Sequence, residues 1–179
     1  MKIVECVPNF SEGRNMSVID QITEEIKKIK GVKLLDVDPG FDTNRTVVTF
    51  VGDPESVKEA AFNAIKRSHQ LIDMSAHKGA HPRFGACDVC PIIPVSGITM
   101  EECAETARQL GERLGKELDY PVYFYEYAAT CEERRNLAWV RQGEYEALEA
   151  NLKDPARIPD AGPCEFRPKA GATAVGARD

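Results

Sequence analysis

The residues best suited to chemistry lie in one short stretch, from Ser75 to Pro94, which reads SAHKGAHPRFGACDVCPIIP. It holds two histidines, a lysine and an arginine among glycines and prolines, directly before an apolar run typical of a β-strand. Loops that carry polar, titratable groups on a rigid scaffold are where binding and catalysis concentrate. His81 precedes Pro82, and proline disfavours helical backbone at the residue before it, so we expect extended backbone at His81. The sequence therefore predicts a titratable ring at a loop tip.

General acid–base chemistry is the reaction type that His81 suits. Nearby cations, among them Arg83, favour a neutral imidazole, which can accept a proton near neutral pH. A single histidine is more often structural, but the cationic loop favours the chemical role here. His77 lies four residues earlier, and Gly79 argues against a helix that would place both rings on one face.

The cysteines raise the alternative of a metal site. Cys87 and Cys90 form a C-x-x-C, and His77 and His81 would add further zinc-like ligand types. The pair lies in an apolar strand, however, where residues three apart are expected to point to opposite faces. No second C-x-x-C exists, so the sequence favours a site without metal.

Composition narrows the class of protein. The 179 residues are 42% hydrophobic and 29% charged, which is typical of a globular domain. A net charge of -6, without a basic stripe, argues against a nucleic-acid partner. No apolar run reaches the roughly 18 residues of a membrane span, and the N-terminus does not resemble a signal peptide. Without export signals the six cysteines are expected to stay reduced, and the cytoplasm is the expected compartment.

The hydrophobic pattern predicts an α+β protein. Strands are predicted over 2–7, 32–38, 45–51, 86–95 and 122–127, and helices over 17–30, 54–71, 99–118 and parts of 131–153. The first six elements run β-α-β-β-α-β, the order of the ferredoxin-like split β-α-β sandwich, an open sheet with helices on one face. The last strand and helix are then extra C-terminal elements. A doubly wound nucleotide-binding sheet is the rival, but neither of its glycine-rich phosphate motifs is present.

Several polar residues fall at the ends of these strands. Asn9 follows the first strand, Asp38 ends the second, and Arg45 begins the third. Strands one and three are neighbours in the predicted sheet, so their loops could gather into one site. Singly, each residue also fits a structural role: Asn9 and Asp38 in turns, Arg45 in a surface ion pair.

Longer motifs carry a resemblance to a known family. They are VECVPNFSEGRN (4–15), LLDVDPG (34–40), TNRTVVTFVG (43–52), LIDMSAHKGAHPRFGACDVCPIIPV (71–95) and GATAVGAR (171–178). In this order, across nearly the whole chain, they resemble glutamate formiminotransferase, the folate enzyme of histidine breakdown. The resemblance implies transfer of a formimino group from N-formimino-L-glutamate to N5 of tetrahydrofolate, the co-substrate, in a cleft between two similar α/β subdomains.

The resemblance also assigns residues. His81, in HPR, matches the catalytic base, and Asp38, the second acid of LLDVD, is expected at the active site. Arg45 and Arg83 are residue types that could hold a glutamate carboxylate through two parallel hydrogen bonds. The folate-contacting segment of the family falls on Gly162, Pro163, Cys164, Glu165, Phe166, Arg167, Pro168, Lys169, Ala170 and Gly171.

Members of the family are expected to continue past GAR into a second subdomain, so this chain corresponds to a truncated, one-subdomain form. Residues 1–154 would be the N-terminal subdomain, and 155–179 an extended folate-lining linker with the start of the second subdomain. The expected partners are small molecules; nucleic acid and membrane are not expected, and homodimerisation stays open. Two alternatives also remain: a non-catalytic folate-binding module, and a metal-binding regulatory domain.

Overall fold

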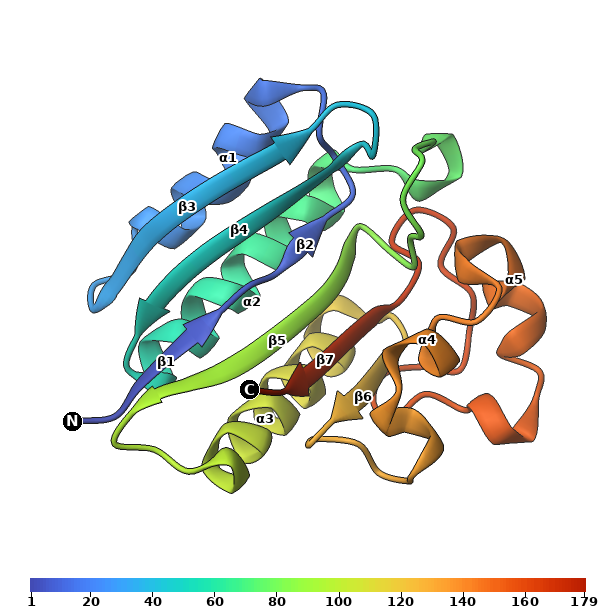
Figure 1. Ribbon diagram of the computed structural model, residues 1–179. Coiled ribbons are helices and arrows are strands. Elements are labelled where there is room, and N and C mark those ends of the chain that lie inside the picture. Colours follow the sequence, from blue (N-terminus) through green and yellow to red (C-terminus); the bar gives the residue numbers. More distant parts are fainter.

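Seven strands form one sheet in the computed structural model, which describes all residues 1–179 (Figure 1). They are β1 (Ile3–Cys6), β2 (Asn9–Phe10), β3 (Val32–Gly40), β4 (Arg45–Gly52), β5 (Cys87–Ser96), β6 (Val122–Glu126) and β7 (Thr173–Ala177). β3 pairs with β4, β4 pairs with β1 and β2, and these two pair with β5, all antiparallel. β7 then runs parallel between β5 and β6.

Three long helices cover one face of the sheet: α1 (Met16–Lys27), α2 (Pro54–Leu71) and α3 (Met100–Leu118) (Figure 1). Side chains cap each N-terminus, because the first amide groups of a helix lack partners within it. Asp53 caps α2, and α3 opens on a capping box of Thr99 and Glu102. None of the helices combines the length and apolar character needed to cross a bilayer.

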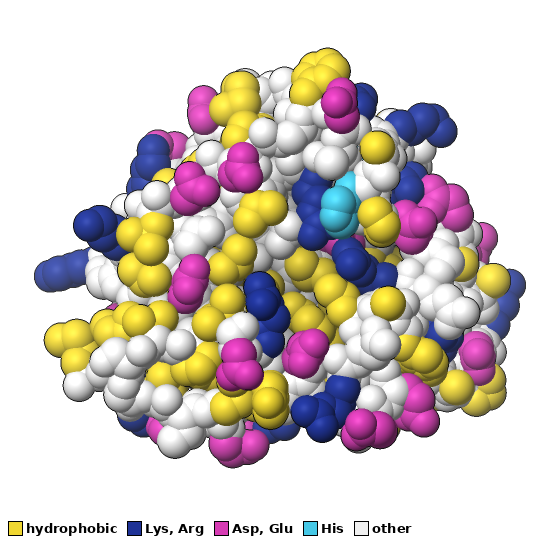
Figure 2. Space-filling view, viewed as in Figure 1, with side chains coloured by type: hydrophobic (Ala, Val, Ile, Leu, Met, Phe, Trp, Pro, Cys, Tyr) yellow, Lys and Arg dark blue, Asp and Glu magenta, His cyan; other side chains and the backbone are white.

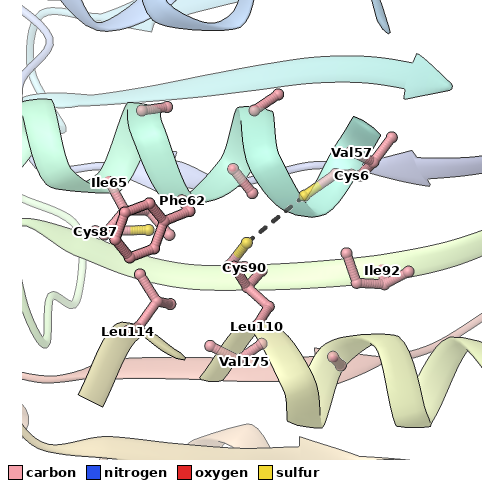
Figure 3. Packing of buried hydrophobic residues seen from close by; sticks show 14 of the residues in the cluster. Cys6, Val57, Phe62, Ile65, Cys87, Cys90, Ile92, Leu110, Leu114 and Val175 are labelled. Atoms are coloured by element: carbon pink, nitrogen blue, oxygen red, sulfur yellow. Dashed lines mark hydrogen bonds between the residues drawn. The ribbon is translucent and has the colours of Figure 1, made fainter. Parts of the chain in front are cut away.

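The main core lies between the sheet and these three helices. Along β4, Val48 and Phe50 are fully buried, whereas the alternate residues are only half-buried, because successive side chains point to opposite faces. Figure 3 shows Cys6, Cys87 and Cys90 among the aliphatic and aromatic side chains of this core, with the Cys6 and Cys90 sulfurs 3.6 Å apart.

A smaller core covers the opposite face, but only beside β6 and β7. Two short helices, α4 (Leu137–Val140) and α5 (Glu144–Asn151), pack there on Tyr123 and Tyr125, while the intervening Phe124 joins the main core. The rest of this face, over β3, β4, β1 and β2, carries no helix. Figure 2 looks onto it and shows basic and histidine side chains beside a hollow.

The predicted α+β class, with one sheet and helices on one face, is confirmed. Residues 131–153 are helical in part, as predicted, with a 3-10 turn and two short helices. Two details differ from the sequence prediction. The first strand is divided into β1 and β2 at Val7 and Pro8, and residues 173–177, where no strand was predicted, form β7.

The C-x-x-C geometry also differs from expectation. Cys87 and Cys90 were predicted on opposite faces of their strand, yet both lie in the main core. The reason is an irregularity in β5, where Phe10 pairs with Cys87 but Asn9 pairs with Val89, so the alternation slips by one residue.

Candidate active site

The uncovered part of this sheet face holds a pocket of about 210 Å³, the His81 pocket, beside the start of β4. It is lined by Asn9, Asp38, Gly40, Thr43, Arg45, Val47 and His81. Strand pairing explains part of this arrangement, because Asn9 and Asp38 both pair with Val47, from opposite sides. Three residues that the sequence singled out, His81, Asp38 and Arg45, therefore share one pocket.

The histidine loop, residues 77–83, is fastened to the turn between β3 and β4. The His77 ring Nε2 lies 2.9 Å from the Asn44 carbonyl oxygen, and the Asn44 amide donates to the Lys78 carbonyl at 2.9 Å. The Ala80 N–H donates to the Asp42 carbonyl at 3.1 Å. Burial lowers the pKa of His77, so its neutral ring can donate to Asn44. His77 thus supports the loop, and His81 faces the pocket.

His81 is half-buried and contacts two groups. Its Nδ1 lies 2.8 Å from the Pro82 carbonyl oxygen and 2.5 Å from Arg45 Nη1, and its Nε2 lies 3.3 Å from the same Arg45 atom. A ring that carries its proton on Nδ1 donates to Pro82 and can accept from Arg45 at Nε2, whereas a ring that carries it on Nε2 can accept from Arg45 at Nδ1. In the first tautomer a substrate N–H that replaces Arg45 at Nε2 can give up its proton to the ring.

Arg45 is held by the protein on two of its three nitrogens. Nε donates to the Asn9 side-chain oxygen at 2.7 Å, and Nη1 lies 3.4 Å from the Asp88 carboxylate. Burial lowers the pKa of Arg45 from its ordinary value, and the Asp88 charge opposes this shift. Nη2 has no protein partner, so Arg45 can offer a ligand that one nitrogen, rather than the full two-pronged edge that the sequence suggested.

Asp38 reaches the pocket from β3 as an exposed carboxylate. No hydrogen bond or ion pair within the protein engages its side chain, although it lies at a fixed register opposite Val47. A carboxylate without protein partners is free to accept hydrogen bonds from a cationic or N–H-bearing ligand.

Arg83 does not line this pocket. Its guanidinium donates to the His77 carbonyl at 3.1 Å, pairs with Glu146 at 2.6 Å, and lies 5.6 Å from the centre of the Tyr145 ring. These contacts tie the histidine loop to α5. The structure therefore separates the two arginines that the sequence treated alike.

The resemblance predicts that the segment 162–171 contacts folate. No residue of this segment lines the His81 pocket, but the segment reaches both ends of the histidine loop. The Met74 N–H, just before the loop, donates to the Lys169 carbonyl at 2.9 Å. Just after it, the Ala86 N–H donates to the Ala170 carbonyl at 2.9 Å. Most side chains of this segment are exposed or half-buried.

The four residues of the metal alternative do not form a cluster. Cys87 and Cys90 point into the main core, where burial raises the pKa of the Cys87 thiol well above its ordinary value. His77 Nε2 is engaged with Asn44, and His81 lies on the other face of the sheet.

Two residues around the pocket were missed by the sequence analysis. Asp88 pairs with Arg45, and Arg141, which lies 53 residues later in the sequence, also pairs with Asp88. A single acid inside the apolar run ACDVC is a usable signal, because a carboxylate is almost never fully buried unless it is paired. Arg141 gives no comparable signal in the sequence.

Comparison with known proteins gives a family match. The sequence pattern described as "Formiminotransferase domain, N-terminal subdomain" matches residues 3–178. The formimidoyltransferase-cyclodeaminase of Mus musculus is 56% identical over 177 residues, which are 99% of this chain and 33% of that protein.

Shorter relatives also match nearly the whole of this chain. The glutamate formimidoyltransferase of Streptococcus pyogenes serotype M1 is 49% identical over 99% of this chain and 59% of its own length. That of Thermoplasma acidophilum is 46% identical over 100% of this chain and 59% of its own. The chain thus spans between one third and three fifths of the length of these relatives.

Proposed function

The chain belongs to the family of formiminotransferase N-terminal subdomains, and from this premise we propose that it forms one side of the active-site cleft of a glutamate formimidoyltransferase, the side that carries the catalytic base. The reaction would move the formimino group from N-formimino-L-glutamate to N5 of tetrahydrofolate, which serves as co-substrate. The observation that carries the proposal is the meeting of His81, Asp38 and Arg45 in one pocket, on the part of the sheet face that no helix covers.

His81 is proposed as the proton carrier. N5 of tetrahydrofolate attacks the electrophilic formimino carbon, a new C–N bond forms, and the N5 proton passes to Nε2 of the neutral ring. The tetrahedral intermediate then breaks its bond to the glutamate nitrogen, which receives the proton back from His81. General acid–base catalysis of this kind contributes about 10²- to 10⁴-fold.

Asp38 and Arg45 are proposed to orient the donor substrate. The Asp38 carboxylate has no protein partner, so it can stabilise the amidinium that makes the formimino carbon electrophilic. Arg45 can offer Nη2 to a glutamate carboxylate. We assign this contact to Arg45 rather than Arg83, because Arg83 already serves His77 and Glu146.

The segment from Gly162 to Gly171 is proposed to bind the folate. This proposal is supported by the hydrogen bonds of the segment at both ends of the histidine loop and by the exposure of its side chains.

We further propose the division into a subdomain of residues 1–154 and a linker of residues 155–179, with a second subdomain supplying the opposite wall of the cleft. Six free cysteines favour the cytoplasm as the site of action. Homodimerisation stays a prediction.

We propose that the first part of the chain is a ferredoxin-like split β-α-β unit, with β1 and β2 acting as one strand. The antiparallel neighbours β3, β4, β1 and β5, in that spatial order, support this description.

The direct test measures binding and transfer separately. Isothermal titration with 5-formyltetrahydrofolate, a stable reduced folate, is run on this chain and on the chain joined to a second subdomain. The joined protein is then assayed for consumption of N-formimino-L-glutamate in the presence of tetrahydrofolate. We expect tighter folate binding and turnover in the joined protein. Binding without turnover would leave a non-catalytic folate-binding module, and absence of both would contradict the proposal.

A further inference from the structure

Asp88 is the most deeply buried carboxylate of the chain, with 1% of its surface exposed. One carboxylate oxygen accepts a hydrogen bond from the Phe84 N–H, and the other pairs with Arg141 and with Arg45. The two arginine side chains are themselves only 15% and 14% exposed. A carboxylate is rarely buried to this degree, and two guanidinium groups share this one.

The electrostatic arrangement is unequal, because two positive charges face one negative charge. Burial raises the pKa of Asp88, while Arg141 and Arg45 oppose that rise. With Asp88 ionised, the three groups keep one net positive charge, directly beneath the His81 pocket. Removal of the Asp88 charge would leave two guanidinium groups facing each other in a poorly hydrated space.

Arg45 connects this buried group to the pocket. Asn9 holds its Nε at 2.7 Å and Asp88 faces its Nη1 at 3.4 Å, so the guanidinium has little freedom to turn. The same Nη1 lies 2.5 Å from His81 Nδ1. The position of Arg45 beside the imidazole therefore depends on the carboxylate behind it.

We propose that Asp88, held by Arg141, is a positioning residue that fixes Arg45 beside the His81 ring. Its catalytic consequence rests on the proposed function, in which His81 accepts a proton. A proton on His81 would face the positive charge of Arg45, and the Asp88 carboxylate offsets that charge. Of the other charged groups near the ring, Asp38 reaches the pocket from β3, and Lys78 belongs to the histidine loop itself.

The chain contains a matched control for a merely structural ion pair. Arg134 and Asp160 pair at 2.9 Å, their side chains are 8% and 7% exposed, and Asp160 also accepts from the Phe124 N–H at 2.8 Å. This pair resembles the Asp88 pair in burial and bonding, but neither residue lines the His81 pocket. Asp88→Asn and Asp160→Asn are therefore compared throughout.

The first readout does not need turnover. Long-range ¹H–¹⁵N spectra of the imidazole rings report the tautomer of each of the three histidines, and His81→Gln assigns the His81 signals. We expect Asp88→Asn to shift the His81 ring signals, and Asp160→Asn to leave them within experimental error, while both variants lose thermal stability. Unchanged His81 signals in a folded Asp88→Asn protein would overturn the proposal.

The second readout is kinetic, in the chain joined to its second subdomain. We expect Asp88→Asn to lower kcat at least tenfold with KM for tetrahydrofolate within twofold, and to move the acidic limb of the kcat–pH profile to lower pH. Asp160 lies in the linker that carries the proposed folate-binding segment, so its variant is compared here only in the pH profile, and Asp160→Asn should leave the acidic limb where wild type has it. An acidic limb that Asp88→Asn leaves unmoved would show a structural role only and overturn the proposal.

Arg141 supplies variants for the case in which Asp88→Asn does not fold. Arg141→Met should shift the His81 signals and lower kcat, and Arg141→Lys, which restores the charge, should recover at least half of the lost kcat. If Arg141→Met changed neither the His81 signals nor kcat, the proposal would be contradicted. If wild type showed no transfer at all, the proposed function would fail, whereas the imidazole spectra would still decide the role of Asp88.

Discussion

The Cα of Gly79 lies so close to the Thr43 backbone that a methyl group on Gly79 would overlap the Thr43 carbonyl oxygen. This close approach lets the histidine loop lie flat on the turn between β3 and β4, which is how His81 reaches the pocket. Backbone cannot yield as a flexible side chain can, so Gly79→Ala must displace the loop. We expect at least a tenfold loss of kcat in the joined protein, measured in the transfer assay.

Ala80→Ser is the control for that loop. Ala80 is exposed, and only its backbone N–H is used, toward Asp42. It should keep kcat within twofold of wild type. A Gly79→Ala protein as active as the control would mean that the position of the loop does not matter for transfer.

Asp38→Asn tests the charge opposite His81. Because the side chain is exposed and has no protein partner, the melting temperature should stay within about 2 °C of wild type. We expect the catalytic efficiency with N-formimino-L-glutamate to fall about tenfold, which corresponds to about 1.4 kcal/mol of lost stabilisation. Asp36→Asn is the matched control, since Asp36 is also exposed and lies two residues earlier on β3. Equal effects of the two substitutions would contradict a specific role for Asp38.

Arg83→Met separates support of the loop from contact with substrate. It removes the bonds to His77 and Glu146, and loss of such charge-assisted contacts costs on the order of 1–3 kcal/mol. We expect a lower melting temperature by differential scanning calorimetry, while the affinity of the folded protein for N-formimino-L-glutamate stays unchanged. A selective rise in KM for this substrate without loss of stability would transfer the carboxylate contact to Arg83.

The burial of His69 predicts that the free energy of unfolding depends on pH. Burial lowers its pKa to about 4, and its Nε2 is enclosed without a partner while the ring packs against Tyr120 at 4.3 Å. The unfolded chain, with an ordinary histidine pKa of about 6.5, binds more protons between these values, so stability is full above about pH 6.5 and falls toward pH 4. Between pH 7 and 5 this loss is on the order of 2 kcal/mol.

Urea unfolding at several pH values measures this loss. His69→Gln cannot take up the proton, so its unfolding free energy should vary less between pH 7 and 5 than that of wild type. Identical pH slopes in the two proteins would contradict the assignment to His69.

Local signals in the sequence predicted most of the first 127 residues. The capping box of Thr99 and Glu102 and the alternation along β4 are formed by neighbours in the chain, so they could be identified without tertiary information. β7 could not be identified. Its sequence, TAVGA, lacks the bulky residues typical of strands, because β7 lies between β5 and β6 and the Tyr125 ring lies directly against Gly176.

The same distinction applies to the pocket. His81 and Asp38 stand in continuous motifs, so residue type and order were enough to nominate them. The contact of Arg141 with Asp88, and the ion pair of Arg83 with Glu146 of α5, depend on how distant segments pack. A short motif carries no information about such packing, which is why two similar arginines could not be ranked from the sequence.

The central claim is that the His81 imidazole carries the proton, and His81→Ala in the joined two-subdomain protein tests it most directly. The variant is compared with Lys78→Ala, an exposed change in the same loop. We predict that His81→Ala lowers kcat by about 10²- to 10⁴-fold while the affinity for 5-formyltetrahydrofolate stays within twofold, and that Lys78→Ala does neither. Turnover by His81→Ala within twofold of wild type would contradict the claim.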